Sequence, residues 1–263
     1  MDNALHITLI GSGNVAWHLG STLAVNHTVD AVWSRRIEHA RHLAALTGGT
    51  AIDSMAQLPT NSDFYILAVS DDAIATVAKS LPPLSGLVVH TSGSIAMSAL
   101  EGAKRIGVFY PFQTFSKQKK VQMDEVPFLV EANNVQDIQL LSRLAQSVSP
   151  KVFNASSAQR LKLHLAAVFA SNFTNHLYGI AGDILKNADL PFDLLHPLLA
   201  ETAQKACSMN PYEAQTGPAV RGDAQVIAKH LKLLEQQPQW QQLYRQISRS
   251  IAEQQRIISQ NKT

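Results

Sequence analysis

Hydrophobic positions along the chain follow two patterns, and one gives way to the other near residue 155. Before that point, short apolar runs alternate with stretches whose apolar residues recur every three to four positions. Strands are expected at 6–10, 29–33, 63–69, 86–90, 106–110, 127–131 and 151–154. Strands that alternate with helices predict a parallel sheet covered by helices on both faces.

From residue 156 onward the pattern is helical throughout. Helices are expected at about 157–186, 192–209, 223–236 and 238–260, with prolines at 191, 211, 218 and 238 as breakers. The fold class is therefore α/β, with a doubly wound parallel sheet over 1–155 followed by an all-α domain over 156–263. The amphipathic last helix is expected to pack on this domain or on a second subunit.

Composition narrows the kind of partner. The chain has 263 residues, of which 46% are hydrophobic, and its 22 basic and 20 acidic residues are mixed along the sequence, with no basic stripe for nucleic acid. No apolar run reaches the roughly 18 residues of a membrane span, and no signal peptide is predicted. The single cysteine, Cys207, excludes internal disulfides and favours the cytoplasm, and its side chain is expected to be buried or half-buried. We expect a small-molecule partner.

The most specific motif follows the first strand. Gly11-Ser12-Gly13-Asn14-Val15-Ala16 leads directly from this strand into a helix. Gly11 permits the tight turn, Gly13 lets the backbone approach a diphosphate, and Ala16 allows close contact between helix and strand. The helix offers unpaired N–H groups to phosphates. This position in the first strand-turn-helix unit predicts a Rossmann domain that binds a dinucleotide.

The end of the second strand discriminates between cofactors. NAD-binding domains usually place an acidic residue there, whereas this chain has Ser34-Arg35-Arg36. A hydroxyl and guanidinium groups suit a 2′-phosphate, so NADP is favoured over NAD. The alternative is that Arg35 and Arg36 are solvated residues at the start of a helix.

Two further turns follow buried strands, where a doubly wound sheet binds its ligand. In the first, Val69, Ser70 and Asp71 are expected beside the nicotinamide ribose. In the second, Thr91 and Ser92 are expected to approach the nicotinamide or a substrate. Asp71 or Asp72 would equally cap the following helix, and for Asp72 the cap is the favoured interpretation.

The helical domain offers two candidate groups. A rotation of 100° per residue places Arg160, His164, Ser171 and Asn175 on one stripe, with Asn172 at its edge. His164 is a candidate for proton transfer, or alternatively a histidine held by hydrogen bonds in the packing. In a later loop, Arg221 is a candidate clamp for a substrate anion or a member of a structural salt bridge, and Asp223 is expected to cap a helix.

The order of these motifs, GSGNVA, VWSRR, LAVSDDAI, VVHTSGS, FYPFQTFS and TGPAVRGD, resembles a known family. Its members are Rossmann-like NADP oxidoreductases with a C-terminal helical domain of unknown function (DUF2520). They are related to deazaflavin-dependent NADP oxidoreductases, pyrroline-5-carboxylate reductase and the 6-phosphogluconate dehydrogenase superfamily. The resemblance covers essentially the whole chain and implies a homodimer formed through the helices.

Two departures from the superfamily concern proton transfer. If Asn172 matches the asparagine that follows the catalytic lysine of hydroxyacid dehydrogenases, the lysine position is Val168. Tyr110-Pro111 stands where prephenate dehydrogenase relatives have His-Pro, and it replaces a group that titrates near neutrality with one that titrates near ~10. Phe109 and Phe115, close by, are expected to be core aromatics.

Together these features predict an NADP-dependent oxidoreductase that transfers a hydride to or from a small polar substrate bound between the domains. His164 would transfer the proton, Asn172 and Ser92 would orient the substrate, and Arg221 would hold its anionic group. The alternative is a non-catalytic NADP-binding sensor or scaffold that has lost the acid-base residue. No metal is indicated, because the ten histidines lack the spacing of ligands.

Overall fold

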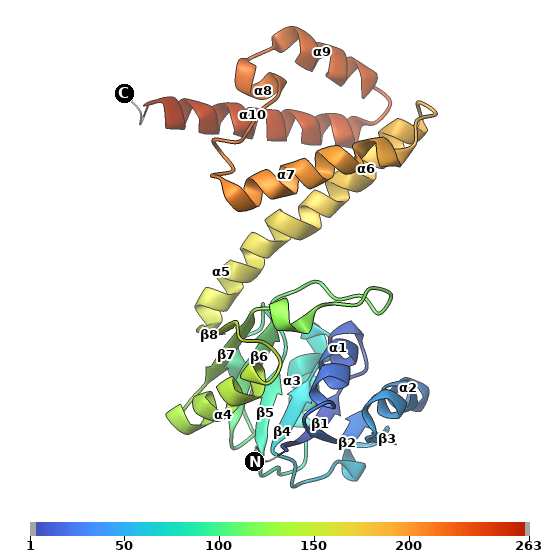
Figure 1. The fold of residues 1–263 in the computed structure, drawn as a ribbon, viewed down its shortest axis with the longest axis vertical. Coiled ribbons are helices and arrows are strands. Elements are labelled where there is room, and N and C mark those ends of the chain that lie inside the picture. Colours follow the sequence, from blue (N-terminus) through green and yellow to red (C-terminus); the bar gives the residue numbers. More distant parts are fainter. Residues whose placement is uncertain (1–3, 261–263) are drawn as a thin grey trace. The chain divides into compact units, whose positions relative to one another are not determined.

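The computed structural model describes residues 4–260 of the chain (Figure 1). It divides into two compact units, Met1–Phe169 and Ala170–Thr263, which we describe separately. This division falls inside the helical run that follows the sheet rather than near residue 155.

The first unit is built on one sheet. Within the described residues, eight strands lie in the order β3-β2-β1-β4-β5-β6-β7-β8. They are β1 (His6–Ile10), β2 (Thr28–Trp33), β3 (Thr50–Ile52), β4 (Phe64–Leu67), β5 (Leu87–His90), β6 (Ile106–Pro111), β7 (Phe128–Ala132) and β8 (Val152–Asn154). Strand order reverses between β1 and β4, which creates the crevice where such folds bind ligands. The predicted α/β class is confirmed.

Two details of the sheet differ from the expectation. β7 runs antiparallel to β6, so the sheet is mixed rather than wholly parallel. β3, which pairs with β2 through Thr50–Ile52, was not predicted, because Thr50-Ala51-Ile52 contains one large apolar residue and forms no apolar run.

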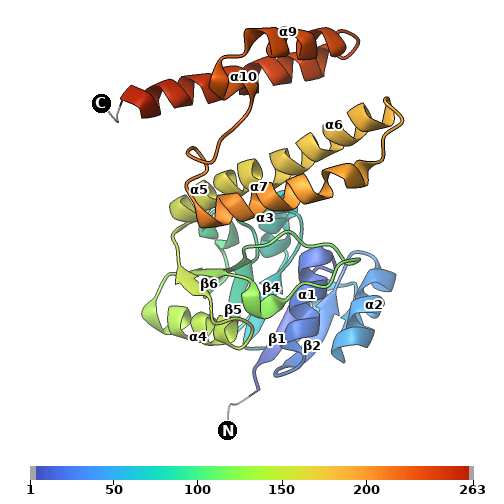
Figure 2. The same ribbon diagram turned by 45° about the horizontal axis from the view of Figure 1, so that its top comes forward.

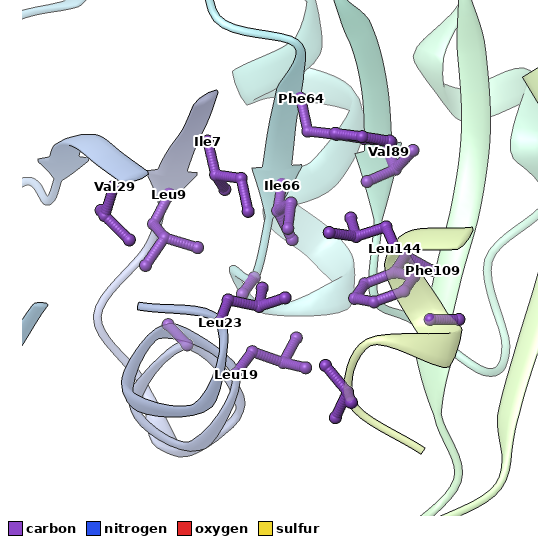
Figure 3. Close-up of a cluster of buried hydrophobic side chains, with 14 of the residues drawn as sticks. Ile7, Leu9, Leu19, Leu23, Val29, Phe64, Ile66, Val89, Phe109 and Leu144 are labelled. Atoms are coloured by element: carbon purple, nitrogen blue, oxygen red, sulfur yellow. The ribbon is translucent and has the colours of Figure 1, made fainter. Parts of the chain in front are cut away.

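Helices cover both faces of the sheet. They are α1 (Asn14–Leu23), α2 (Ile37–Thr47), α3 (Asp71–Lys79) and α4 (Val135–Gln146), with short 3-10 helices η1 (Met55–Gln57), η2 (Met97–Leu100) and η3 (Met123–Glu125). Helix α5 (Ser157–Ala167) follows β8, and Arg160 is its buried residue. Side chains of α1, α2 and α4 join one buried cluster, and those of α3 and η2 join another. Figure 3 shows the first cluster, in which Leu19 and Leu23 of α1 and Leu144 of α4 approach Leu9, Ile66 and Phe109 of the sheet.

Local sequence explains where several helices begin. Ser156 starts α5 through a capping box with Gln159, and Asn134 caps α4 by accepting a hydrogen bond from the Asp137 amide. Helix α3 begins at Asp71, with Ser70 at the capping position. Asp72 therefore lies within the first turn of α3, where its charge favours the helix dipole, and the prediction that it caps the helix is wrong.

The second unit is helical in all its regular structure that is described. A π-helical segment, Val168–Phe173, leads into α6 (Thr174–Lys186), followed by η5 (Phe192–Leu195), α7 (His196–Ser208), α8 (Pro218–Arg221), α9 (Ala224–Leu233) and α10 (Pro238–Gln260). In both views α6 lies beside α7, and α9 lies beside α10 (Figures 1 and 2). Asp223 caps α9 by accepting from the Val226 amide at 3.2 Å, which confirms that prediction.

The π-helical segment bears on one prediction about side-chain direction. A π turn holds more residues than an α turn, so the rotation of 100° per residue stops applying at Val168. The placement of Ser171 and Asn175 on the stripe of His164 assumed an unbroken α-helix, and it stays a prediction.

The second unit lacks a buried core of its own. No residue described between 170 and 260 is buried, and large apolar side chains remain exposed, among them Leu177, Ile184, Leu198, Leu233 and Ile257. Cys207 is also exposed, which corrects the expectation that it is buried or half-buried: it lies on α7, none of whose residues is buried. No helix in the described part of the chain is long and apolar enough to cross a membrane.

Candidate functional site

The glycine-rich turn at the end of β1 has the geometry of a phosphate cradle. Gly11 has φ +122°, and a Cβ atom there would lie 2.3 Å from the carbonyl oxygen of Ala68, so only glycine fits. Gly13 caps α1, and a Cβ atom built on it meets no described atom within 4 Å. The backbone of this turn is therefore open to a ligand, while Ala16 is fully buried against the sheet as predicted.

A groove of about 680 Å³ opens beside this turn. It is lined by the Gly11–Gly13 turn, by residues 33–36 after β2, and by Val69 and Ser70 after β4. Three segments that the sequence analysis assigned to a cofactor thus line one groove at the point where strand order reverses. The groove also includes His39 of α2 and Thr76 of α3, which sequence reasoning missed because no motif marks them.

The end of the groove formed by β2 is rich in hydrogen-bond donors. Ser12 Oγ donates to Ser34 Oγ at 3.0 Å and joins the glycine turn to this end. Arg35 and Arg36 are exposed, and neither forms a salt bridge within residues 4–260. None of the residues described as lining the groove is acidic. This end of the groove therefore offers unpaired positive charge to an anion.

A second cluster lies where β5 ends. A Cβ atom on Gly93 would lie 2.7 Å from the hydroxyl oxygen of Tyr110 on β6 and 2.9 Å from Nδ1 of His164 on α5. Burial raises the pKa of Tyr110, so its phenol stays protonated at neutral pH. The buried Nδ1 of His164 has no hydrogen-bond partner among the described residues. The structure thus places a proton donor and an unpaired imidazole nitrogen next to the α-carbon of Gly93.

The turn between β5 and η2 is fixed by its own hydroxyl groups. Ser92 Oγ accepts from the amides of Ser94 and Ile95, both at 3.1 Å, and Thr91 Oγ1 donates to the Leu67 carbonyl at 3.4 Å. Asp71 accepts from Ser94 Oγ at 2.5 Å. Ser92, predicted to orient a substrate, is buried and shapes this turn.

Arg160 has a structural role in the described chain. It is 1% exposed, and its guanidinium forms a salt bridge with Glu131 and donates to the carbonyls of Ser92 (3.1 Å) and Ile95 (2.6 Å). It fixes the first turns of α5 to the turn that follows β5. Although Arg160 shares a stripe with His164, its guanidinium is not available to a ligand, because these buried acceptors use its donors.

Asn172 and Arg221 belong to the second unit, where both side chains are exposed. Arg221 forms no salt bridge with any residue that the structure describes, so the structural ion pair considered for it is not found there. The roles of Asn172 and Arg221 toward a substrate stay predictions. Nowhere between residues 4 and 260 do three potential metal ligands come together.

Two family models match successive parts of the chain. Residues 6–91 match the family described as NADP oxidoreductase, coenzyme F420-dependent, and residues 126–251 match a domain of unknown function, DUF2520. No curated protein matches the chain.

Solved structures resemble the whole chain. A protein of Bacteroides fragilis described as a candidate NADP oxidoreductase is 41% identical, with 95% of this chain and 98% of that chain covered and a TM-score of 0.88. A Thermotoga maritima protein is 26% identical, over 95% and 99% of the two chains, with a TM-score of 0.71. A pyrroline-5-carboxylate reductase from Coxiella burnetii shares the fold, at 16% identity, 95% and 99% coverage and a TM-score of 0.53.

The resemblance in the order of motifs is thus confirmed by the two domain matches and by identity along nearly the full length. The chain belongs to the family of NADP oxidoreductases in which an N-terminal NADP oxidoreductase domain is followed by a DUF2520 domain.

Proposed function

We propose that the chain is an NADP-dependent oxidoreductase that transfers a hydride between NADP(H) and a small polar substrate. The observation that carries this proposal is the groove beside β1, in which the glycine turn, Ser34 and Arg35 line one cavity without an acidic residue. A nicotinamide dinucleotide, when bound, supplies or accepts the hydride, and the protein supplies position and protons.

The residues present fit such a cofactor. The space above Gly13 leaves the amides at the start of α1 free for a diphosphate. The buried indole N–H of Trp33, which lines the groove, has no partner among the described residues and is a further donor to a polar ligand. Val69 and Ser70 would approach the nicotinamide ribose beyond β4, and Asp71, Thr91 and Ser92 hold the neighbouring turns in place.

Preference for NADP over NAD follows from the β2 end of the groove. A 2′-phosphate placed there would meet Ser34, Arg35 and Arg36, and planar guanidinium groups bind phosphate oxygens in pairs. A ribose without the phosphate would leave these cations unpaired, and it would find none of the carboxylates that NAD-binding domains use.

Proton transfer is assigned to the cluster at Gly93. Reduction of a carbonyl or imine needs a proton at its oxygen or nitrogen, and Tyr110 retains one because burial raises its pKa. His164 is the neighbour that would return the proton, because its Nδ1 is buried and unpaired within the described chain. This pair would replace the lysine that the superfamily uses and that Val168 does not provide.

The helical unit is proposed to form a homodimer. Its described residues include no buried side chain, and an apolar groove of about 260 Å³ lies between α6, α8 and α10. An exposed apolar surface of this kind is unfavourable for a lone chain. A second copy of the chain would cover this surface. Sedimentation of the wild type and of Ile247→Asp tests the proposal, and we expect a wild-type dimer that the aspartate dissociates. A monodisperse monomeric wild type would contradict it.

The cofactor assignment is tested by calorimetric titration of NADPH and NADH against wild type, Arg35→Ala and Arg41→Ala. Arg41 is the matched control, because it is an exposed arginine on α2 that pairs with Glu38 outside the groove. We expect Arg35→Ala to weaken NADPH binding by about 10-fold or more and to leave NADH unchanged, since charged hydrogen bonds contribute about 1.5–3 kcal/mol. A wild type that binds neither nucleotide would overturn the proposal.

Turnover is then sought with imines, keto acids and hydroxy acids, using wild type, Tyr110→Phe and His164→Gln. We expect both variants to bind NADPH normally and to lose about 100-fold or more in kcat, the usual contribution of a positioned acid or base. Tight NADPH binding without turnover of any substrate class would favour a sensor over an enzyme.

A further inference from the structure

The segment between β6 and β7 is attached to the start of α1. Asn14 Nδ2 donates to the Phe115 carbonyl at 3.0 Å, and His18 Nε2 lies 3.0 Å from the Ser116 carbonyl. The rings of His18 and Phe115 also pack with their centroids 5.1 Å apart. Figure 1 shows this segment in green above α1. Residues 115 and 116 are thus held on α1, which fixes the position of the next residue.

That next residue, Lys117, places its ammonium group at the glycine turn. Lys117 Nζ donates to the carbonyl oxygen of Ser12 at 3.1 Å and lies 4.9 Å from the ring centroid of Trp17 on α1. It forms no salt bridge in the part of the chain that the structure describes. An ammonium group has three donors, so one hydrogen bond to a neutral carbonyl leaves two for another acceptor.

A cation beside the glycine turn would strengthen the binding of a dinucleotide's diphosphate. The turn's own donors are neutral amides, and the first turn of α1 contains no acidic residue that would compete for Lys117. Arg35 and Arg36 lie at the β2 end of the groove, where they would meet a 2′-phosphate, so no cation is assigned to the two charges of the diphosphate. A charged hydrogen bond from lysine to phosphate is about twice as strong as a neutral one.

We propose that Lys117 binds the diphosphate of the nicotinamide dinucleotide and that the segment between β6 and β7 is therefore part of the cofactor site. The proposal rests on the proposed function and extends it to a residue that comes from outside the strand-turn-helix motif. The segment's attachment through Asn14 and His18 gives these two side chains a positioning role. The Ser12 carbonyl holds the ammonium group beside the turn before the phosphates arrive.

This role separates Lys117 from the arginines after β2. The diphosphate is common to NADPH and NADH, so loss of Lys117 weakens both nucleotides equally and leaves their ratio unchanged. Loss of Arg35 weakens NADPH alone. Adenosine 2′-monophosphate has the 2′-phosphate but no diphosphate. Its binding therefore depends on Arg35 and not on Lys117, which distinguishes the two side chains in the opposite way.

The experiment compares wild type with Lys117→Met, Lys117→Arg and Lys119→Met. Methionine keeps an unbranched side chain without the charge, arginine restores the charge, and Lys119 is an exposed lysine of the same segment that serves as control. Each protein is titrated with NADPH, NADH and adenosine 2′-monophosphate at low and at high salt. Thermal unfolding verifies that the variants fold, which we expect because Lys117 is exposed.

We expect Lys117→Met to weaken NADPH and NADH by the same factor of about 10, with a smaller loss at high salt. Lys117→Arg should recover most of the affinity, and Lys119→Met should bind as wild type does. Unchanged binding of both dinucleotides by Lys117→Met would overturn the role of Lys117 and leave the proposed function standing, as would a loss confined to NADPH. A wild type that binds no dinucleotide would overturn both.

Discussion

The hydroxyl oxygen of Tyr110 and Nδ1 of His164 lie against the same α-carbon, that of Gly93, at 2.7 Å and 2.9 Å from where a Cβ atom on it would be. The two side chains come from β6 and α5, which are distant along the chain, and they meet over the turn that follows β5. Gly93 is therefore the residue whose lack of a side chain permits this arrangement.

Gly93→Ala should displace both Tyr110 and His164, because atoms under 3.0 Å from a Cβ position must move. We expect a loss of about 1–3 kcal/mol in the free energy of unfolding, typical of overpacking, measured by denaturant titration. Gly179→Ala on α6 is the control, since a Cβ atom there meets no described atom within 4 Å. Equal stability of Gly93→Ala and wild type would show that the cluster is not packed as described.

Alanine at the two glycines of the turn should have opposite consequences. Gly11→Ala brings a methyl group to 2.3 Å from the Ala68 carbonyl at a positive φ, so we expect poor folding. Gly13→Ala meets no described atom and has an ordinary negative φ, so the variant should fold normally and lose at least about 10-fold in NADPH affinity, because the methyl group occupies the diphosphate's approach. Circular dichroism measures folding and calorimetry measures NADPH binding, so together they separate these outcomes. Normal NADPH binding by Gly13→Ala would show that the diphosphate does not bind at Gly13.

Stability should decline in mild acid because of His90. Burial, followed by the neighbouring positive charge of Arg160, lowers the pKa of His90 from 6.5 to about 4. As pH falls, the unfolded chain therefore binds a proton at His90 before the folded chain does. The contribution of His90 to the free energy of unfolding is complete above about pH 6.5 and is lost as pH falls toward 4. The shift corresponds to roughly 3 kcal/mol.

Unfolding titrations between pH 7.5 and about 4.5 check this prediction against His90→Asn, whose amide oxygen can accept the Ser92 amide as Nδ1 does at 3.2 Å. The free energy of unfolding of His90→Asn should depend less on pH than that of the wild type. If the two proteins show the same dependence on pH, groups other than His90 cause the decline. His6→Asn is a control of opposite sign, because hydrogen bonding to Asp30 raises the pKa of His6 and its contribution is lost as pH rises.

Removing Arg160 should destabilise the first unit. Arg160→Met leaves the Glu131 carboxylate and the carbonyls of Ser92 and Ile95 without their buried donor, and breaking one side of such a pair costs about 3–5 kcal/mol. Lys162→Met, an exposed position on the same helix, should change stability by about 0.5 kcal/mol or less. Denaturant unfolding of both variants measures the difference, and equal stabilities would argue against the network.

Local patterns in the sequence were sufficient for most of the elements and for the three segments that line the groove beside β1. The strand-to-turn transition at Gly11, the basic residues after β2 and the long helices after residue 156 are properties of adjacent residues, and the structure has them where the sequence predicted. Sequence periodicity could not resolve β3, which lacks an apolar run, or the antiparallel direction of β7, since strand direction depends on pairing with distant residues.

Only the tertiary structure decided which polar residues lie close together. Arg160 and His164 are four residues apart on α5, and the sequence places them on one stripe. In the structure, Arg160 donates to buried acceptors, whereas His164 has an unpaired nitrogen next to Gly93. The sequence marked Tyr110 only as a departure from relatives that have histidine there, and it did not mark Lys117, because their partners Gly93 and Ser12 are distant along the chain. A side chain's role depends on which groups surround it in space, and local sequence specifies helices, strands and turns without specifying these neighbours.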